Sequence, residues 1–141
     1  MNQSKTYGLT HLAISVTDIE RTLKFYQQVF EMEIMYHEKD MIQLTTPGSF
    51  DILVFEQKTK DTIHLNSGID HFGFRLREAK DIDVIITKIN LAGGTIIDKG
   101  DFVPGSPYVF FKDPDGYTVE VWYELIPTEL IPTKKENHPA N

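Results

Sequence analysis

The 141-residue sequence contains no cysteine, so no disulfide bond can form within it. It has no apolar run long enough to cross a bilayer, and its first twelve residues lack the apolar centre of a signal peptide. Positive charge is scarce: 14 Lys and Arg against 21 Asp and Glu give a formal net charge of -7, which argues against nucleic acid or an anionic membrane as partner. We therefore expect a cytoplasmic protein that acts on a small molecule.

The composition is that of one ordinary globular domain. Its length suits a single core, and its glycine, aromatic and charged fractions are unremarkable. We expect one domain over residues 1–125. Residues 126–141 contain three prolines and end in polar residues, so we expect a tail outside any sheet.

The first half of the chain predicts a strand, a helix and three further strands. Between residues 11 and 16, apolar and smaller or polar side chains alternate, as in a half-buried strand. Residues 17–30 carry apolar side chains at helical spacing, and Thr17 and Glu20 have the spacing of a capping box. Three short apolar runs then predict strands at 33–37, 41–45 and 51–55.

The second half repeats this order. We expect a strand at 71–76, a helix at 79–94 that ends in glycine, and strands at 95–98, 107–112 and 117–123. The chain thus divides into two βαβββ modules, at about 7–56 and 69–125, and neither is large enough to form a good core alone.

A histidine occupies the same place in both modules. His11 and His71 each open a strand and share its face with a small residue two positions later, Ala13 or Gly73. The opposite faces carry the bulky side chains and should pack under the helices. We therefore expect both histidines on the concave side of a curved sheet.

Glu120 lies in the middle of an otherwise apolar strand, where a carboxylate needs a partner. Two imidazoles and one carboxylate suit a divalent metal with open positions, so we predict a site made of His11, His71 and Glu120. The alternative is two packed histidines and a glutamate held by a backbone amide or a lysine.

Glu56 is a candidate fourth ligand or general base. Alignment of the two turns places Leu53, not Glu56, opposite Glu120. Glu56 stands three residues further along and should point to the other face unless a bulge turns it back.

Other side chains are candidates for the substrate pocket. Arg75 shares the histidine face and could bind an anionic group, although a surface ion pair would explain it equally well. Tyr108 and Trp122 could form an aromatic wall, with core packing as the alternative. His37 and His64 lie in polar stretches and are expected in solvent.

Three motifs in this order resemble the vicinal oxygen chelate superfamily, which includes glyoxalase I, extradiol dioxygenases and bleomycin-resistance proteins. They are "HLAISVTDIERTLKFYQQVF", "DHFGFRL" and "DPDGYTVEVW", and the resemblance covers about residues 7–125. It implies an α+β fold in which paired βαβββ modules form an open, curved eight-stranded mixed sheet with helices on the outer face.

The resemblance also implies a homodimer in which each metal site takes His11 from one chain and His71 and Glu120 from the other. It implies a divalent ion (Zn, Ni, Co, Mn or Fe) and a small substrate with neighbouring oxygens, with glyoxalase-like lyase or isomerase chemistry favoured over a dioxygenase. The alternative is a bleomycin-resistance-type protein that sequesters a small molecule without catalysis.

The fosfomycin-resistance members of the superfamily fit less well at three places. They usually have threonine where Ala13 stands, tyrosine where Phe110 stands, and a basic segment in place of the acidic "YELIPTEL".

Overall fold

The computed structural model describes residue 9, residues 11–63, residue 69 and residues 71–123. The predicted tail at 126–141 and the histidine at position 64 lie outside these residues.

The first module forms a four-stranded sheet covered by one helix. Its elements are β1 (Leu12–Val16), α1 (Ile19–Phe30), β2 (Glu33–Glu38), β3 (Met41–Thr45) and β4 (Leu53–Gln57), followed by the 3-10 turn η1 (Lys60–Thr62). The strand order is β1-β4-β3-β2, with β1 parallel to β4 and the other pairs antiparallel.

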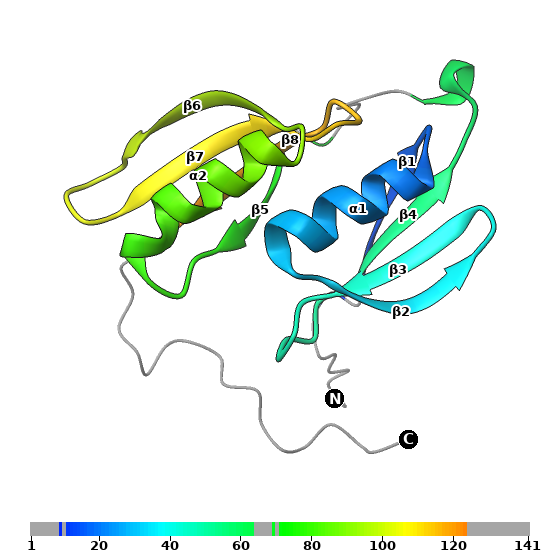
Figure 1. The fold of residues 1–141 in the computed structure, drawn as a ribbon, viewed down its shortest axis with the longest axis horizontal. Helices are drawn as coiled ribbons and strands as arrows, with labels where there is room; N and C mark the ends of the chain where they lie inside the picture. Colours follow the sequence, from blue (N-terminus) through cyan, green and yellow to red (C-terminus); the bar gives the residue numbers. More distant parts are fainter. Residues whose placement is uncertain (1–8, 10, 64–68, 70, 124–141) are drawn as a thin grey trace, which may run out of the picture.

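The second module repeats the pattern. Its elements are β5 (Phe72–Arg75), the 3-10 turn η2 (Ala79–Asp81), α2 (Ile82–Leu91), β6 (Thr95–Asp101), β7 (Pro107–Lys112) and β8 (Thr118–Trp122). The order is β5-β8-β7-β6, again with the first strand parallel to the last. The predicted α+β fold of two βαβββ modules is confirmed. Its eight strands are hydrogen-bonded as two open four-stranded sheets, and α1 and α2 lie side by side against them (Figure 1).

Several element boundaries differ from the prediction by one to three residues, and the largest extension is that of β6, predicted at 95–98, which runs to Asp101. Two of the differences have a visible local cause. The strand predicted from residue 51 begins at Leu53, because the Asp51 carboxylate accepts hydrogen bonds from the Thr46 amide and hydroxyl and thereby closes the preceding turn. The helix predicted over 79–94 starts with a 3-10 turn and ends at Leu91, two residues before Gly93 adopts a φ of 94°.

The predicted capping box at the start of α1 is wrong by one residue. Asp18 is the N-cap, and its Oδ1 accepts a hydrogen bond from the Arg21 amide at 3.1 Å. Thr17 lies outside the helix, where its hydroxyl accepts from the Arg21 guanidinium at 3.2 Å. The residue three positions after the N-cap is therefore an arginine, which cannot accept the reciprocal bond of a capping box.

The core lies between the helices and the inner faces of both sheets. The bulky side chains of β1 and β5, predicted to pack under the helices, belong to this core or pack against it. Phe25 and Tyr26 of α1 and Phe55 of β4 are at most 1% exposed. Burial of each such large side chain contributes roughly 1.5–3 kcal/mol. Buried residues of both modules thus belong to one core cluster.

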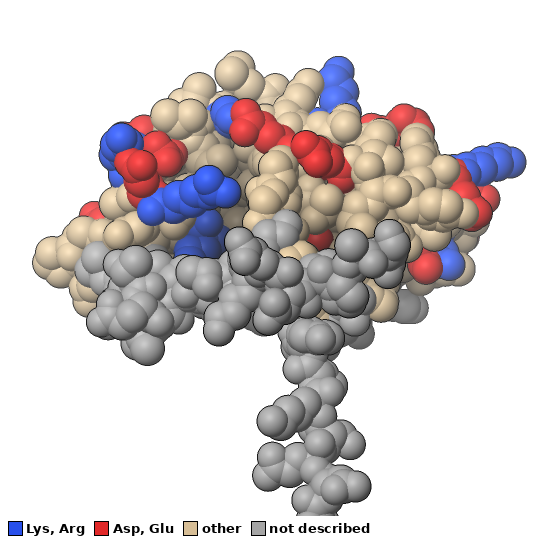
Figure 2. Space-filling model, turned by 90° about the horizontal axis from the view of Figure 1, so that it is seen from below, with Lys and Arg blue, Asp and Glu red and all other residues tan. Residues whose placement is uncertain are grey.

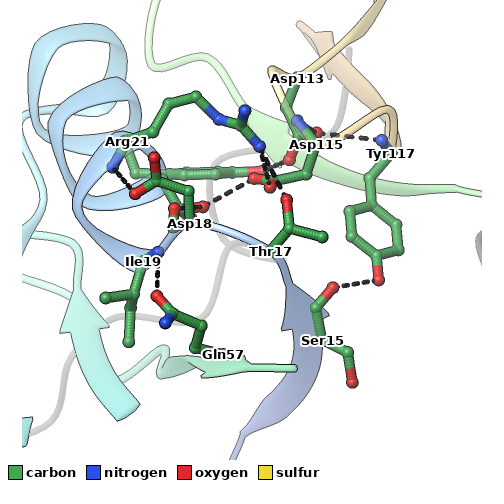
Figure 3. Close-up of polar contacts among 11 residues, drawn as sticks. Ser15, Thr17, Asp18, Ile19, Arg21, Gln57, Asp113, Asp115 and Tyr117 are labelled. Atoms are coloured by element: carbon green, nitrogen blue, oxygen red, sulfur yellow. Dashed lines mark hydrogen bonds and ion pairs between the residues drawn. The ribbon is translucent and has the colours of Figure 1, made fainter. Parts of the chain in front are cut away.

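Polar contacts also connect the modules, through a set that we call the inter-module clamp (Figure 3). Its members are Arg21, Thr22 and Tyr26 of α1 and Asp113 and Asp115 of the turn between β7 and β8. Asp115 accepts hydrogen bonds from Arg21 at 2.8 Å and Thr22 at 2.7 Å, and Asp113 accepts one from Tyr26 at 2.8 Å. The "DPDG" sequence therefore holds the second module to the helix of the first.

Candidate metal and substrate site

The open face of the second sheet, opposite the helices, collects polar and aromatic side chains. Residues paired directly across neighbouring strands share a face of the sheet. Glu120 of β8 is paired with Gly73 on one side and Phe110 on the other, so all three lie on this face. The same register and the alternation of β5 place these residues on the open face: His71, Gly73, Arg75, Tyr108, Phe110, Glu120 and Trp122.

His71 and Glu120 meet on this face. The His71 Nε2 lies 3.3 Å from a carboxylate oxygen of Glu120. The glutamate side chain is 13% exposed and the histidine side chain 35% exposed, so both remain reachable from solvent. The sequence prediction paired these two residues, and the structure brings them together.

Gly73 keeps the two strands close beside this pair. A Cβ atom at Gly73 would lie 2.9 Å from the Glu120 backbone oxygen and 3.3 Å from the Glu120 Cβ. The backbone oxygen belongs to a paired strand and cannot rotate away as a side chain could. The absence of a side chain at position 73 therefore helps to set the position of Glu120.

We expect Gly73→Ala to destabilise the protein by about 1–3 kcal/mol and to displace Glu120 from His71, because the added methyl group overpacks the strand pair. Denaturant unfolding measures the first effect, and transition-metal titration the second. Gly100→Ala is the matched control, since its Cβ would meet only the mobile end of the Tyr108 ring, at 3.3 Å. Equal metal affinity in Gly73→Ala and wild type would contradict the prediction.

Aromatic rings extend the site along the open face. Phe110 stands perpendicular to the His71 ring at a centroid distance of 5.2 Å. Tyr108 stacks on Phe102 at 4.1 Å, and Phe102 meets Trp122 edge-on at 5.7 Å. Tyr108 and Trp122 are thus on the open face and not in the core. The sequence reasoning missed Phe102, which only the β6–β7 hairpin brings to the other rings.

His11 and His71 both line one open cavity of about 870 Å³. Arg75 lines it as well, together with Arg77, which the sequence reasoning did not single out. Apolar side chains form much of the remaining wall, including Phe72. A cavity with apolar walls and two guanidinium groups suits a small molecule that carries an anionic group.

The strand register corrects the comparison between the modules. In the second module Gly73 is paired with Glu120, and in the first the equivalent Ala13 is paired with Val54. The counterpart of Glu120 is therefore Val54, whereas alignment of the turns had indicated Leu53. The error arose because Asp51 closes the turn and delays the start of β4.

Glu56 consequently shares the open face with Val54 and with His11. It is paired with Ser15, two positions beyond Ala13, and its side chain is 46% exposed. Its carboxylate lies 3.5 Å from the Lys58 ammonium group. His11 and Ser15 are four residues apart, so Glu56 lies about 13 Å along the strand direction from the level of His11.

The other histidine that the structure describes behaves as expected. His37 is exposed on β2, and its Nε2 lies 3.3 Å from an exposed Glu20 carboxylate. This is a surface contact.

The side chains of His11, His71 and Glu120 are of types that can bind a divalent ion. Imidazole nitrogen and carboxylate oxygen are ligands that Zn, Ni, Co, Mn and Fe all accept. Among the described residues, no three His, Asp or Glu side chains are grouped closely enough to hold a metal. His71 and Glu120 are in contact, and His11 lines the same cavity as His71.

On the face in Figure 2, basic and acidic side chains are interspersed among neutral ones. Among the described residues, no helix has the length and apolar character needed to cross a membrane.

Comparison with known proteins assigns most of the chain to one superfamily. The model of the Glyoxalase/Bleomycin resistance protein/Dioxygenase superfamily matches residues 8–121. Lactoylglutathione lyase GLX1 of Arabidopsis thaliana is 26% identical over 125 residues, which cover 79% of this chain but only 42% of the plant protein. Metallothiol transferase FosB of Shouchella clausii is 26% identical over 117 residues, covering 81% of this chain and 78% of that protein.

The fold also resembles solved structures. The fosfomycin resistance protein FosX of Listeria monocytogenes, crystallised with Mn(II) and sulfate, superposes with a TM-score of 0.71. The superposition covers 86% of this chain and 94% of FosX at 17% sequence identity. At that identity, the likeness supports the fold alone.

Proposed function

Because this chain belongs to the glyoxalase/bleomycin resistance protein/dioxygenase superfamily, we propose that it is a metal-dependent enzyme acting on a small molecule with two neighbouring oxygen atoms. The observation that carries the proposal is the contact between His71 and Glu120, two metal-ligand side chains, on an open sheet face beside aromatic rings. Lyase or isomerase chemistry of the glyoxalase kind is our first choice, ahead of a dioxygenase reaction.

The proposed metal site is shared between two chains of a homodimer. His71 and Glu120 of one chain would hold the ion together with the partner's His11. One chain cannot complete such a site from its described residues, which agrees with this arrangement. A two-fold dimer would contain two equivalent sites.

When bound, a divalent ion with open positions supplies Lewis-acid stabilisation for negative charge that develops on substrate oxygens. The chain's own residues would bind and orient the substrate. Phe110, Tyr108 and Trp122 offer apolar ring surfaces that also exclude water, and Arg75 offers a cation for an anionic group.

Glu56 is the proposed general base. Its carboxylate is exposed on the sheet face that also bears His11, as an acceptor of a substrate proton must be. Because Glu56 lies about 13 Å along β1 from the level of His11, it would take a proton from a part of the substrate remote from the metal, not from the atoms beside the metal-bound oxygens. Glu56→Gln keeps the shape of the side chain, so loss of turnover with metal content unchanged is the result that supports this role.

Elemental analysis of protein purified without chelator tests the metal proposal. We expect about one transition metal per chain, since each chain supplies one full set of three ligands to the dimer. The His11→Ala, Glu120→Ala double variant should contain almost none. A wild-type protein that has no metal and takes up none when it is offered would refute the proposal.

The second candidate function is that of a protein that sequesters a small molecule without catalysis. The ring stack of Phe102 and Tyr108, with Phe102 51% exposed, offers a binding surface that needs no metal. His71→Ala distinguishes the two functions. If the variant loses both its metal and its turnover, the result supports the enzyme. If its ligand binding is unchanged, as measured by the fluorescence of the single tryptophan, the result supports the binding protein.

A further inference from the structure

A second open cavity of about 870 Å³ lies apart from the proposed metal site. It is found where the parallel strands β1 and β4 end and α1 begins, next to the turn that carries Asp115. None of His11, His71 and Glu120 lines it. The carboxyl ends of parallel strands are frequent places for ligands in α/β proteins.

Arg21 lines this cavity, and its guanidinium is held by polar contacts (Figure 3). Its Nη2 donates hydrogen bonds to Asp115 at 2.8 Å and to the Thr17 hydroxyl at 3.2 Å. The Asp115 side chain is only 2% exposed and also accepts a bond from Thr22, so it fixes the guanidinium from the interior. The Nε and Nη1 groups of Arg21 have no hydrogen-bond partner among the described residues, and 44% of the side chain is exposed. An oriented guanidinium with free donors is suited to an oxyanion.

Further hydrogen-bond donors line the same cavity. The Gln57 Oε1 accepts a hydrogen bond from the Ile19 amide at 3.0 Å, which leaves the amino group of this side chain available to a ligand. Lys60 has no ion-pair partner within the described part of the chain. Among the described residues, Lys58 is paired only with Glu56, at 3.5 Å, and both side chains are about half exposed, so this pair is weak.

The charges of the lining favour an anion. Among the described residues, three basic ones line the cavity against two acidic ones, Asp40 and Asp115, in a chain whose net charge is -7. Both Asp115 oxygens are already engaged by Arg21 and Thr22. Asp40 is therefore the only lining carboxylate among the described residues with no bond to its side chain.

We propose that this cavity binds the phosphate group of a small molecule through Arg21, Lys58 and Lys60, with the Gln57 amide as an additional donor. The inference does not depend on the metal site or on the reaction. A phosphate dianion, with more acceptor oxygens and more charge than a carboxylate, makes better use of three cations.

The test is a titration of the full chain with inorganic phosphate at about 0.15 M ionic strength. The amide chemical shifts of the protein are measured at each phosphate concentration. We expect saturable shifts at residues 15–21 and 57–60, while residues 71–77 and 118–122 remain unchanged. Lys58→Gln, Lys60→Gln should weaken phosphate binding about tenfold, because two of the three cations are lost. Both lysines are exposed, so this variant should fold.

Lys80→Gln, Lys99→Gln is the matched control, with the same change in charge at two exposed lysines outside the cavity. It should bind phosphate like wild type. Equal weakening in both double variants would show a general charge effect and overturn the proposal. So would the absence of saturable shifts up to about 10 mM phosphate. Acetate is the comparison ligand, and acetate binding as tight as phosphate binding would refute the assignment to phosphate.

Discussion

A mixture of His11→Ala and Glu120→Ala subunits should recover about one quarter of the wild-type metal sites, although neither variant binds metal alone. If each site takes His11 from one chain and Glu120 from the other, a mixed dimer contains one intact site and one site that lacks both ligands. Random exchange makes about half of the dimers mixed, so about one quarter of all sites are whole. Elemental analysis after co-refolding of equal amounts measures this fraction.

A second mixture provides the control. His71→Ala and Glu120→Ala remove ligands that the same chain supplies, so no exchange of subunits can rebuild a site. Metal content that stays near zero in both mixtures would exclude a site shared in this way. Recovery in the first mixture alone would also identify the dimer, because monomers cannot complement one another.

The stability of the folded protein should depend strongly on pH through the buried Asp113 of the inter-module clamp. The carboxyl is 4% exposed, and its removal from water raises its pKa from 3.8 to about 6, although the hydrogen bond from Tyr26 opposes this shift. The folded protein therefore binds this proton more tightly than the unfolded chain does. The corresponding stability is fully present below pH 3.8 and is lost as the pH rises through about 6.

Asp113→Asn should remove this pH dependence, because the amide cannot ionise. A pKa difference of about two units corresponds to about 3 kcal/mol. We expect the free energy of unfolding of Asp113→Asn, relative to wild type, to increase by about that amount between pH 4 and pH 7. Denaturant unfolding at several pH values measures the difference. A difference between the two proteins that is constant over this range would contradict the interpretation of Asp113.

Tyr26→Phe extends the same test. The variant loses a buried hydrogen bond to a charged group, so it should be less stable at pH 7 by about 2 kcal/mol. The difference in stability between Tyr26→Phe and wild type should be smaller near pH 4, where Asp113 is neutral. Tyr108→Phe is the control, since its hydroxyl binds Asp98 at 3.0 Å in an exposed pair and should contribute little. Equal losses in both variants would argue against a special role for the clamp.

The local pattern of the sequence was sufficient for the elements and their inner faces. Alternation along β1 predicted that Ile14 and Val16 face the core, and both are buried there. The strand predicted at 107–112 has those bounds in the structure. These features depend on neighbouring residues, whose directions follow from the two-residue period of a strand.

Contacts between distant segments could not be predicted in this way. Asp113 and Asp115 entered the sequence predictions only within the motif "DPDGYTVEVW", whereas the structure uses both to bind α1. The partners are 87 and 93 residues apart for Tyr26 and Thr22, and no short pattern relates positions so far separated. Phe102 was missed for the same reason.

By itself, the sequence determined that the chain has two copies of one module, and that a histidine opens the first strand of each. It also determined that Glu120 is an acidic residue within an apolar strand. Only the tertiary structure decided that His71 meets Glu120, that Val54 is the counterpart of Glu120, and that Glu56 shares the face of His11. The reason is physical: periodicity fixes the face on which a side chain lies, but hydrogen bonds between strands fix the register, and a shift of one residue exchanges the faces.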